Sequence, residues 1–258
     1  MSASRAVLVA VGILVVFLAV GWLRLVERTS ETTEVEQVAV TEIRIRPGSG
    51  AVTVRTVDDA QTRIFSCVRY RGGAPQAVYR LDGTVLTLHT SCGTYCSVSF
   101  DVDAPVGVRI TGENGSGPLD LSGVSDVDVR TGSGRITVKG ASGPVTARSN
   151  SGPIHLYGVH GALTAESSSG PVDADGVSSP QARIRTSSGD VNVGLDTPGS
   201  VSAESSSGDV RVAVPDGAYR VRTESSTGRV DSHLDDAPDA EHRIELRSSS
   251  GDIALTTR

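Results

Sequence analysis

The segment SVSAESSSGDVRVAV (200–214) decides the fold, because two short alternating stretches meet there at a small polar corner that ends in a glycine. The same corner occurs nine times, at Gly50, Gly117, Gly134, Gly152, Gly170, Gly189, Gly208, Gly228 and Gly251. Beyond Gly117 the spacing grows slowly, from 17 residues (Gly117 to Gly134) to 23 (Gly228 to Gly251). A nearly constant period of this size predicts a solenoid, in which each repeat forms one coil stacked on the last.

Apolar residues recur at fixed distances on both sides of each corner. Seven residues before the glycine stand Ile43, Ile110, Val127, Val145, Leu163, Ala182, Val201, Val221 and Ile244. Two residues after it stand Val52, Leu119, Ile136, Ile154, Val172, Val191, Val210, Val230 and Ile253. Alternation by two with many β-branched residues predicts strands that bury one face. We therefore expect an all-β chain, a parallel β-solenoid (β-helix-like) of about nine coils.

The corners also carry a second column of small polar residues. Three residues before the glycine, from Gly117 onward, stand Asn114, Thr131, Ser149, Ser167, Thr186, Ser205, Ser225 and Ser248. Hydroxyls at a sharp bend bond to nearby backbone groups, and glycine supplies backbone angles that other residues resist. No histidine or acid repeats beside these serines, so we interpret them as structural ladders rather than as nucleophiles.

One outward column is charged and is our candidate interaction strip. Its members, four residues before each glycine, are Arg46, Glu113, Arg130, Arg148, Glu166, Arg185, Glu204, Glu224 and Arg247. In chain order most neighbours have opposite charges, which stabilise adjacent strands. Arg130 with Arg148, and Glu204 with Glu224, would be like-charged pairs. The column is interpreted either as a solvated face that guards against aggregation or as a mixed-charge docking strip.

The N-terminus contains an apolar run of 18 residues, 6–23, bracketed by Arg5 and Arg24. As a helix it would span ~27 Å, enough for a hydrocarbon core. We expect a transmembrane anchor over 6–23 after a short cytoplasmic tail, 1–5, with an uncleaved or cleaved signal peptide as the alternative. The polar, acidic segment 24–37 is expected to form a stalk. The solenoid is then expected outside the cytoplasm, as the ectodomain of a single-pass protein of the cell membrane.

Segment 38–108 is predicted to hold the first coil and irregular capping strands, and 109–258 the regular solenoid. An open end leaves backbone groups unpaired, so the longer, aromatic-rich strands before residue 108 suit an end cap. At the other end, we expect the last rung, 253–258, to be exposed as an edge for a second copy or another partner.

Three cysteines, Cys67, Cys92 and Cys96, lie in the capping segment. Cys92 and Cys96 are close enough for a disulfide that closes a tight loop, and either could bridge to Cys67, with one thiol left over. A zinc site would need a fourth ligand such as His89, and we favour the disulfide. Aspartate follows the corner glycine at only three corners, while arginine or proline follows it at most others, which disfavours a calcium ladder. We expect no cofactor and no metal.

Composition disfavours two functional classes. The net charge is −6 and no basic patch stands out, so nucleic acid is not an expected partner. The chain has one lysine, Lys139, without a carboxylate cluster beside it in sequence, and its one tryptophan, Trp22, lies in the apolar run. Phosphate-binding and nucleophile-elbow motifs are absent from the sequence. We expect the protein not to be an enzyme.

The chain resembles the bacterial putative-adhesin domains of unknown function. The resemblance rests on the corners followed by alternating strands, as in SSSGDVRVAV (205–214) and SSSGDIAL (248–255), and on FDVDAPVGVRI (100–110). It covers about 38–258 and implies a β-solenoid, with no catalytic or ligand residues to carry over. The function expected is an adhesin, or an envelope binding or scaffolding protein, with cell-wall polymer or another envelope protein as partner. The alternative is a sensor or regulatory partner of another membrane protein in envelope stress.

Overall fold

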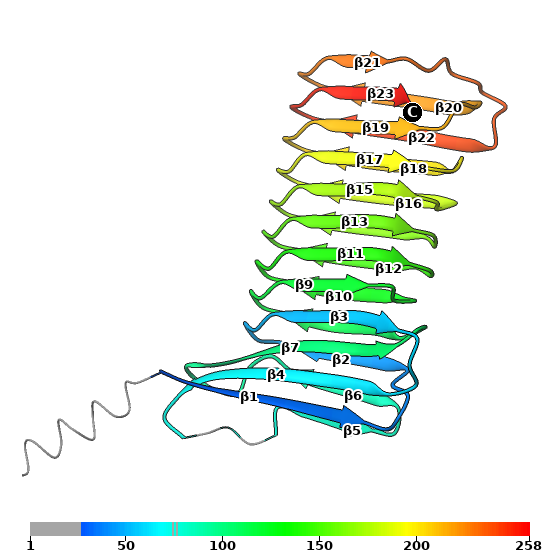
Figure 1. Cartoon of the computed structure of the whole chain (residues 1–258). Coiled ribbons are helices and arrows are strands. Elements are labelled where there is room, and N and C mark those ends of the chain that lie inside the picture. The colour runs from blue at the N-terminus through cyan, green and yellow to red at the C-terminus, as the bar shows by residue number, and fades with distance from the viewer. Residues whose placement is uncertain (1–26, 74, 76) are drawn as a thin grey trace, which may run out of the picture.

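The protein is an all-β rod in the described part of the chain (Figure 1). The structure, a computed structural model, describes residues 27–73, 75 and 77–258. Over this range no helix is long and apolar enough to cross a membrane. The expected cytoplasmic tail and anchor, 1–5 and 6–23, lie outside the described residues.

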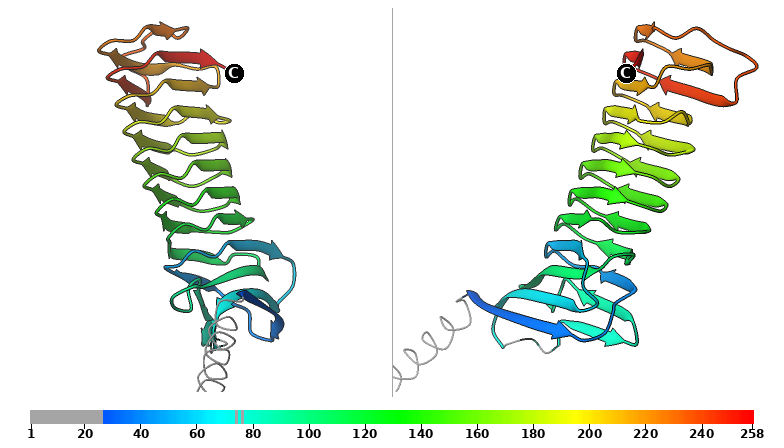
Figure 2. Two further views of the ribbon diagram at one scale, coloured as in Figure 1. Left: turned by 90° about the vertical axis from the view of Figure 1, so that its left-hand side faces the viewer. Right: turned by 45° about the vertical axis from the view of Figure 1, so that its right-hand side comes forward.

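Two sheets run the length of the rod, and each coil contributes one strand to each sheet (Figure 2). Sheet A has the spatial order β1 (Glu27–Glu36), β4 (Thr62–Arg71), β7 (Cys96–Pro105), β3 (Val52–Val57), β9 (Leu119–Ser122), β11 (Ile136–Ala141), β13 (Ile154–Val159), β15 (Val172–Val177), β17 (Val191–Leu195), β19 (Val210–Val214), β23 (Ile253–Thr257) and β21 (Val230–Ser232).

Sheet B has the order β20 (Tyr219–Ser225), β22 (His242–Ser248), β18 (Ser200–Ser205), β16 (Gln181–Thr186), β14 (Leu163–Ser167), β12 (Val145–Ser149), β10 (Val127–Thr131), β8 (Arg109–Asn114), β2 (Glu42–Arg46), β6 (Val85–His89) and β5 (Tyr79–Asp82). Three pairs, β1–β4, β4–β7 and β5–β6, are antiparallel, and the other paired strands are parallel. The prediction of an all-β chain of stacked, mostly parallel strands is confirmed.

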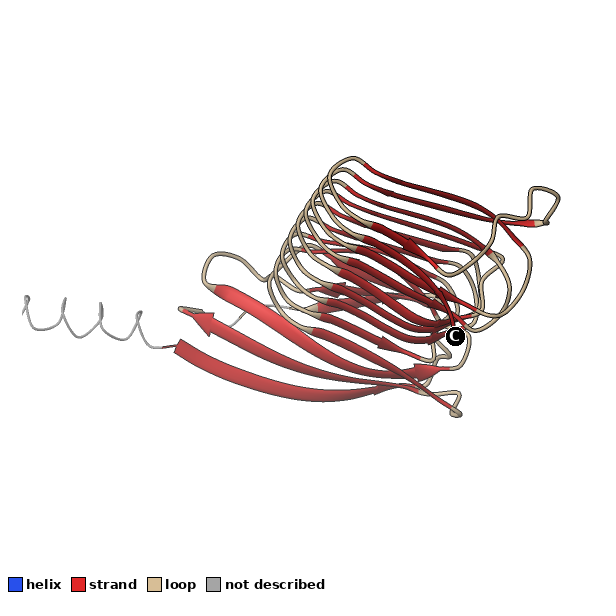
Figure 3. Cartoon of the chain, turned by 90° about the horizontal axis from the view of Figure 1, so that it is seen from above, coloured by secondary structure: helices blue, strands red, loops and turns tan. Residues whose placement is uncertain are grey.

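The core lies between the sheets and is filled by the predicted apolar columns. On β11 and β13, for example, Ile136 is in register with Ile154, and Val138 with Leu156. All four side chains are fully buried. Viewed from above, the coils lie over one another (Figure 3). Equivalent positions are paired in register from coil to coil, as in Ile136, Ile154 and Val172. The repeated columns therefore form one continuous core.

Close stacking, rather than unusual backbone angles, explains the corner glycines. None of the nine has a φ in the left-handed region, which corrects the reason expected from sequence. A Cβ on Gly152 would overlap the carbonyl group of Gly134 in the coil below, because it would lie only 2.6 Å from the carbonyl carbon. The same clash with the corner glycine of the coil below recurs from Gly117 to Gly251. Only hydrogen fits between these backbones.

The small polar residues before the corners form the predicted ladders, and most of them are buried. The Thr186 hydroxyl accepts a hydrogen bond from the Gly189 amide at 3.1 Å and lies 3.4 Å from the Gly170 carbonyl. The Ser205 hydroxyl donates to the Gly189 carbonyl at 2.9 Å. Both side chains are buried. These hydroxyls therefore tie successive corners together, and they face the interior rather than solvent.

The N-terminal end is built out of chain order. The first coil, β2–β3, packs against β8–β9 on one side and against β6–β7 on the other. Strands β4 and β1 then extend sheet A, and β5 extends sheet B. The Tyr79 hydroxyl on β5 contacts the carboxylates of Glu34 and Glu36 on β1, so it links the two sheets at the base of the rod. Burial and these two carboxylates raise the pKa of Tyr79.

The acidic segment expected to be a stalk is mostly strand β1. Its ten residues pair along their whole length with β4, from Glu27 opposite Arg71 to Glu36 opposite Thr62. The sequence of β1 shows no apolar alternation, because nearly all of its residues are exposed. Backbone pairing to the edge of sheet A, not burial of side chains, places it there.

The C-terminal end is also built out of chain order, which corrects the expected position of the last rung. Strands β22–β23 lie between β18–β19 and β20–β21, so 253–258 is not the edge. The inserted coil buries Ile244, Leu246, Ile253 and Leu255, whereas Val230 on the outer coil remains 44% exposed. The more apolar coil thus occupies the interior position, and the more polar coil forms the end.

The loop between β21 and β22 closes part of this outer edge. Asp236 Oδ1 accepts the Val221 amide at 2.8 Å, and the Ala237 amide donates to the Tyr219 carbonyl at 2.9 Å. This loop also carries the acidic residues Asp235, Asp236, Asp239 and Glu241. Its hydrogen bonds give it a role in covering the free edge of β20.

Candidate functional site

The charged column forms one row on the outer face of sheet B, which we call the charge ladder. Its spatial order is Arg46, Glu113, Arg130, Arg148, Glu166, Arg185, Glu204, Arg247, Glu224. The side chains are half-buried or exposed. The structure therefore brings the predicted residues together, but in an order that differs from the sequence at the C-terminal end.

The inserted terminal coil removes one of the two expected like-charge contacts. Arg247 on β22 is in register with Glu204 on β18 and with Glu224 on β20. Glu204 and Glu224 therefore do not meet, and the charges alternate. Arg130 and Arg148 are adjacent, as expected, and remain the like-charged step.

Ion pairs cross the rungs along part of the ladder. Arg148 Nε lies 3.1 Å from Glu166 Oε2, and Arg185 Nη2 lies 2.9 Å from Glu204 Oε2. Arg148 also reaches Asp128 Oδ1 at 3.4 Å, which places a carboxylate beside the like-charged step. Exposed pairs of this kind stabilise a fold by ~0.2–1 kcal/mol each. Their effect on alignment and partner choice is therefore more important than their effect on stability.

The ladder continues into charged neighbours at its ends. Arg247 Nη2 lies 2.8 Å from Glu245 Oε1, while its Nε is 3.9 Å from Glu224 Oε2. At the other end, Arg44 donates to Glu42 at 2.7 Å. That hydrogen bond lowers the pKa of Glu42. The outer face of sheet B is thus a strip of mixed charge rather than a patch of one sign.

Reversing the charge of Glu224 tests the strand order directly. If the coils stacked in chain order, Glu224 would lie between Glu204 and Arg247, so E224R would exchange one attractive contact for another and change the stability little. In the observed order it places an arginine beside Arg247, so we expect destabilisation by a few tenths to ~1 kcal/mol. Urea unfolding of E224R and of the neutral control E224Q measures the difference. Equal stability of E224R, E224Q and the parent protein would contradict the observed order.

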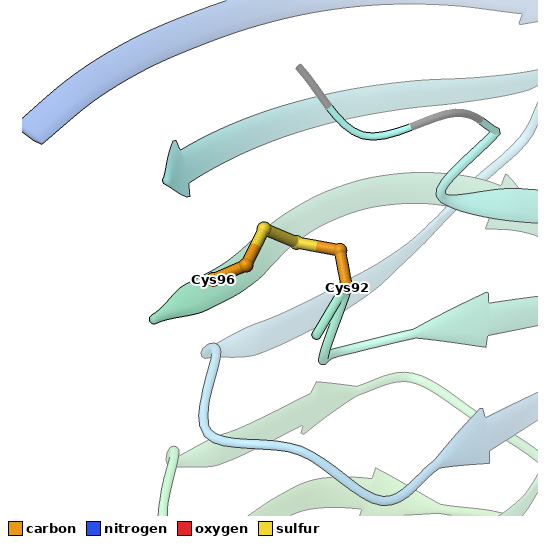
Figure 4. The surroundings of a disulfide bond; sticks show 2 residues. All are labelled: Cys92 and Cys96. Atoms are coloured by element: carbon orange, nitrogen blue, oxygen red, sulfur yellow. A yellow bond between two sulfur atoms is a disulfide. The ribbon is translucent and has the colours of Figure 1, made fainter. Parts of the chain in front are cut away.

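The cysteines form one disulfide, between Cys92 and Cys96 (Figure 4). Cys67 is a free thiol on β4. The two bonded Cα atoms are 5.2 Å apart. The bond occupies two of the sulfurs that a zinc site would need. It also closes a short loop in which Tyr95 has a φ of 57° and is 75% exposed.

Sequence reasoning missed a shallow hollow of about 450 Å³ on the outer face of sheet A. Small residues, Gly194, Ala213 and Ala254, lie in its lining. Arg258 lies across it, with Nη1 2.9 Å from Asp175 Oδ1. Beside it, His155 is half-buried, with Nδ1 3.1 Å from Asp173 Oδ2. The sequence did contain a signal for this hollow, because the outward-facing positions of these strands carry smaller residues than the same positions in earlier coils.

These features define the class of the protein: a repeat protein of stacked β-coils that presents long, regular faces. The chain belongs to the Toastrack family DUF4097, whose family model matches residues 40–257. The resemblance to the putative-adhesin family found in the sequence is confirmed. Among curated proteins, none matches the sequence.

Solved structures similar to this chain come from bacteria. A putative adhesin from Bacteroides fragilis has 10% identity and a TM-score of 0.49, covering 89% of this chain and 97% of that one. A putative adhesin from Parabacteroides merdae has 12% identity and a TM-score of 0.45, covering 90% and 96%. A putative cell adhesion protein from Clostridium sporogenes has 10% identity and a TM-score of 0.28, covering 90% and 100%.

Proposed function

We propose that the protein is a non-enzymatic, single-pass membrane protein whose solenoid lies outside the cytoplasm and binds or scaffolds at the bacterial envelope. The observation that carries this proposal is the charge ladder. A row of alternating charges, held in register by hydrogen-bonded strands, offers a partner a repeated set of contacts at the strand spacing of ~4.8 Å. The apolar run at 6–23 supports attachment to the membrane.

The partner that suits such a surface is itself repetitive or long. Individual exposed charges bind weakly, so affinity must come from many contacts made at once. A rigid ladder favours this because its side chains are already aligned before binding. Cell-wall polymer and an extended face of another envelope protein both offer this chemistry.

Photo-crosslinking on intact cells tests the proposal. Photo-reactive residues replace Arg130 and Arg185 on the ladder, and Lys139 and Tyr157 on the outer face of sheet A provide matched control positions. We expect cell-wall polymer or the surface of a neighbouring cell to be captured from the ladder positions, well above the controls. Capture no greater than at the controls would contradict the proposal.

Two other outcomes have distinct meanings. Capture of one membrane protein of the same cell from the ladder would favour the regulatory or sensor function over adhesion. Turnover of a glycan or an ester by the purified full-length protein would show that the non-enzymatic assignment is wrong.

A further inference from the structure

The base of the rod contains a second surface, separate from the charge ladder, where the described chain begins. A polar hollow of about 680 Å³ lies there, and its lining includes Glu27, Arg69, Arg71 and Tyr95. Glu27 is the first residue of β1. The hollow is therefore next to the point at which the chain leaves the apolar run and enters the solenoid.

The length of chain between these two points limits how far apart they are. The apolar run ends at Leu23 and β1 begins at Glu27, so four residue steps join them. Even a fully extended chain of four steps spans at most ~14 Å. If the run is inserted in a bilayer, as the proposed function requires, the hollow must lie within that distance of the lipid headgroups.

The side chains around the hollow suit a surface of phosphate groups. Two arginines face one carboxylate there, although the chain as a whole has a net charge of −6. Arg71 lies 3.7 Å from Glu27, while Arg69 makes no ion pair within the described residues. Guanidinium groups bind phosphate oxygens in a bidentate manner, so a free arginine next to a membrane fits a headgroup.

Tyr95 adds an aromatic contact to this surface. Its side chain is 75% exposed, and the Arg71 guanidinium lies 5.9 Å from the centre of its ring. The disulfide between Cys92 and Cys96 closes the loop that carries it, and the Arg71 amide donates to the Tyr95 carbonyl at 3.3 Å. Tyrosines are enriched at the headgroup level of membrane proteins because the ring is apolar and the hydroxyl is polar.

We propose that Arg69, Arg71 and Tyr95 dock the base of the rod on the phosphate headgroups of the membrane. This inference rests on the proposed function, because it requires the anchor. Docking would fix the angle between the rod and the membrane, so the charge ladder would face a constant direction. The partner is the lipid surface itself, and neither the ladder nor a protein partner is needed.

Fluorescence quenching on reconstituted full-length protein tests the proposal. The variant W22F removes the native tryptophan, and Y95W then supplies a reporter in the loop. Vesicles contain phosphatidylcholine and phosphatidylglycerol, with or without lipids brominated near the headgroup. The matched control is Y157W in the same W22F background, since Tyr157 is exposed on β13 in the middle of the rod.

We expect brominated lipid to quench the Y95W reporter and not the Y157W reporter. Adding R69Q and R71Q should lower the equilibrium constant for docking about fivefold for each arginine removed. Circular dichroism of each variant shows that the fold is retained.

Flotation of the vesicles separates the two ways of failing. If the protein floats with the vesicles but Y95W is quenched no more than Y157W, the docking inference is wrong and the anchor stands. If the protein does not float with the vesicles, the anchor and the docking inference are both overturned.

Discussion

Replacing Gly152 with alanine is expected to destabilise the solenoid by about 3 kcal/mol or more. The new methyl group would overlap the carbonyl of Gly134 in the neighbouring coil, whose carbon would be 2.6 Å away. Backbone cannot rotate out of the way as a flexible side chain can. The two coils must therefore separate locally, which weakens the hydrogen bonds between β11 and β13 and the core beneath them.

Chemical denaturation of G152A, followed by circular dichroism, measures this effect. The matched control is G73A, because a Cβ on Gly73 would meet nothing within 4 Å and its φ is not in the left-handed region. We expect G73A to unfold within about 0.5 kcal/mol of the parent protein. Equal stability of G152A and G73A would refute the close-stacking explanation of the corners.

The second large effect is expected from Asn114, which joins three coils at the N-terminal end. Its side-chain amide donates to the carbonyls of Gly50 at 2.8 Å and Gly117 at 2.9 Å. Its oxygen accepts from the Thr90 hydroxyl at 2.9 Å. The side chain is 2% exposed. Alanine would leave the Gly50 and Gly117 carbonyls without this donor, at a cost of ~1–3 kcal/mol for each one that stays unpaired, while the Thr90 hydroxyl keeps its hydrogen bond to the Arg46 carbonyl.

We therefore expect N114A to lower the free energy of unfolding by about 3 kcal/mol, with N150A as its control. Asn150 lies in a later corner, and its side chain is exposed. Unfolding of the two variants in urea gives the comparison. If N114A were no more destabilising than N150A, Asn114 would not be the link between these coils.

Most of the regular array could be predicted from the sequence because each position is repeated. A column such as Ile136, Ile154 and Val172 shows the same property several times, so period, face and register follow from the pattern alone. The charged column and the hydroxyl ladder were found in the same way. The glycine column was also found, but the reason for it was not. The close approach of two backbones is not reflected in the types of the residues around it, so the sequence does not reveal it.

The two ends could not be predicted, because a repeat pattern does not say which coil lies beside which. Strand order there depends on which whole coil buries more apolar surface. The more apolar pair β22–β23 therefore takes the interior position, and β20–β21 forms the end. One signal was available: Glu204 and Glu224 repel in chain order, and Arg247 relieves that contact only when inserted between them. β1 was missed for a different reason, since an exposed edge strand has no apolar alternation.

The insertion of the last coil also affects how the rod would respond to a pulling force. In a solenoid stacked in chain order, tension on the free end would peel off one coil at a time. Here β23 is bonded to β19 on one side and to β21 on the other. Tension at Arg258 must therefore break two rows of hydrogen bonds together. We expect the first detachment of a strand at this end to need a higher force than the removal of a coil stacked in chain order.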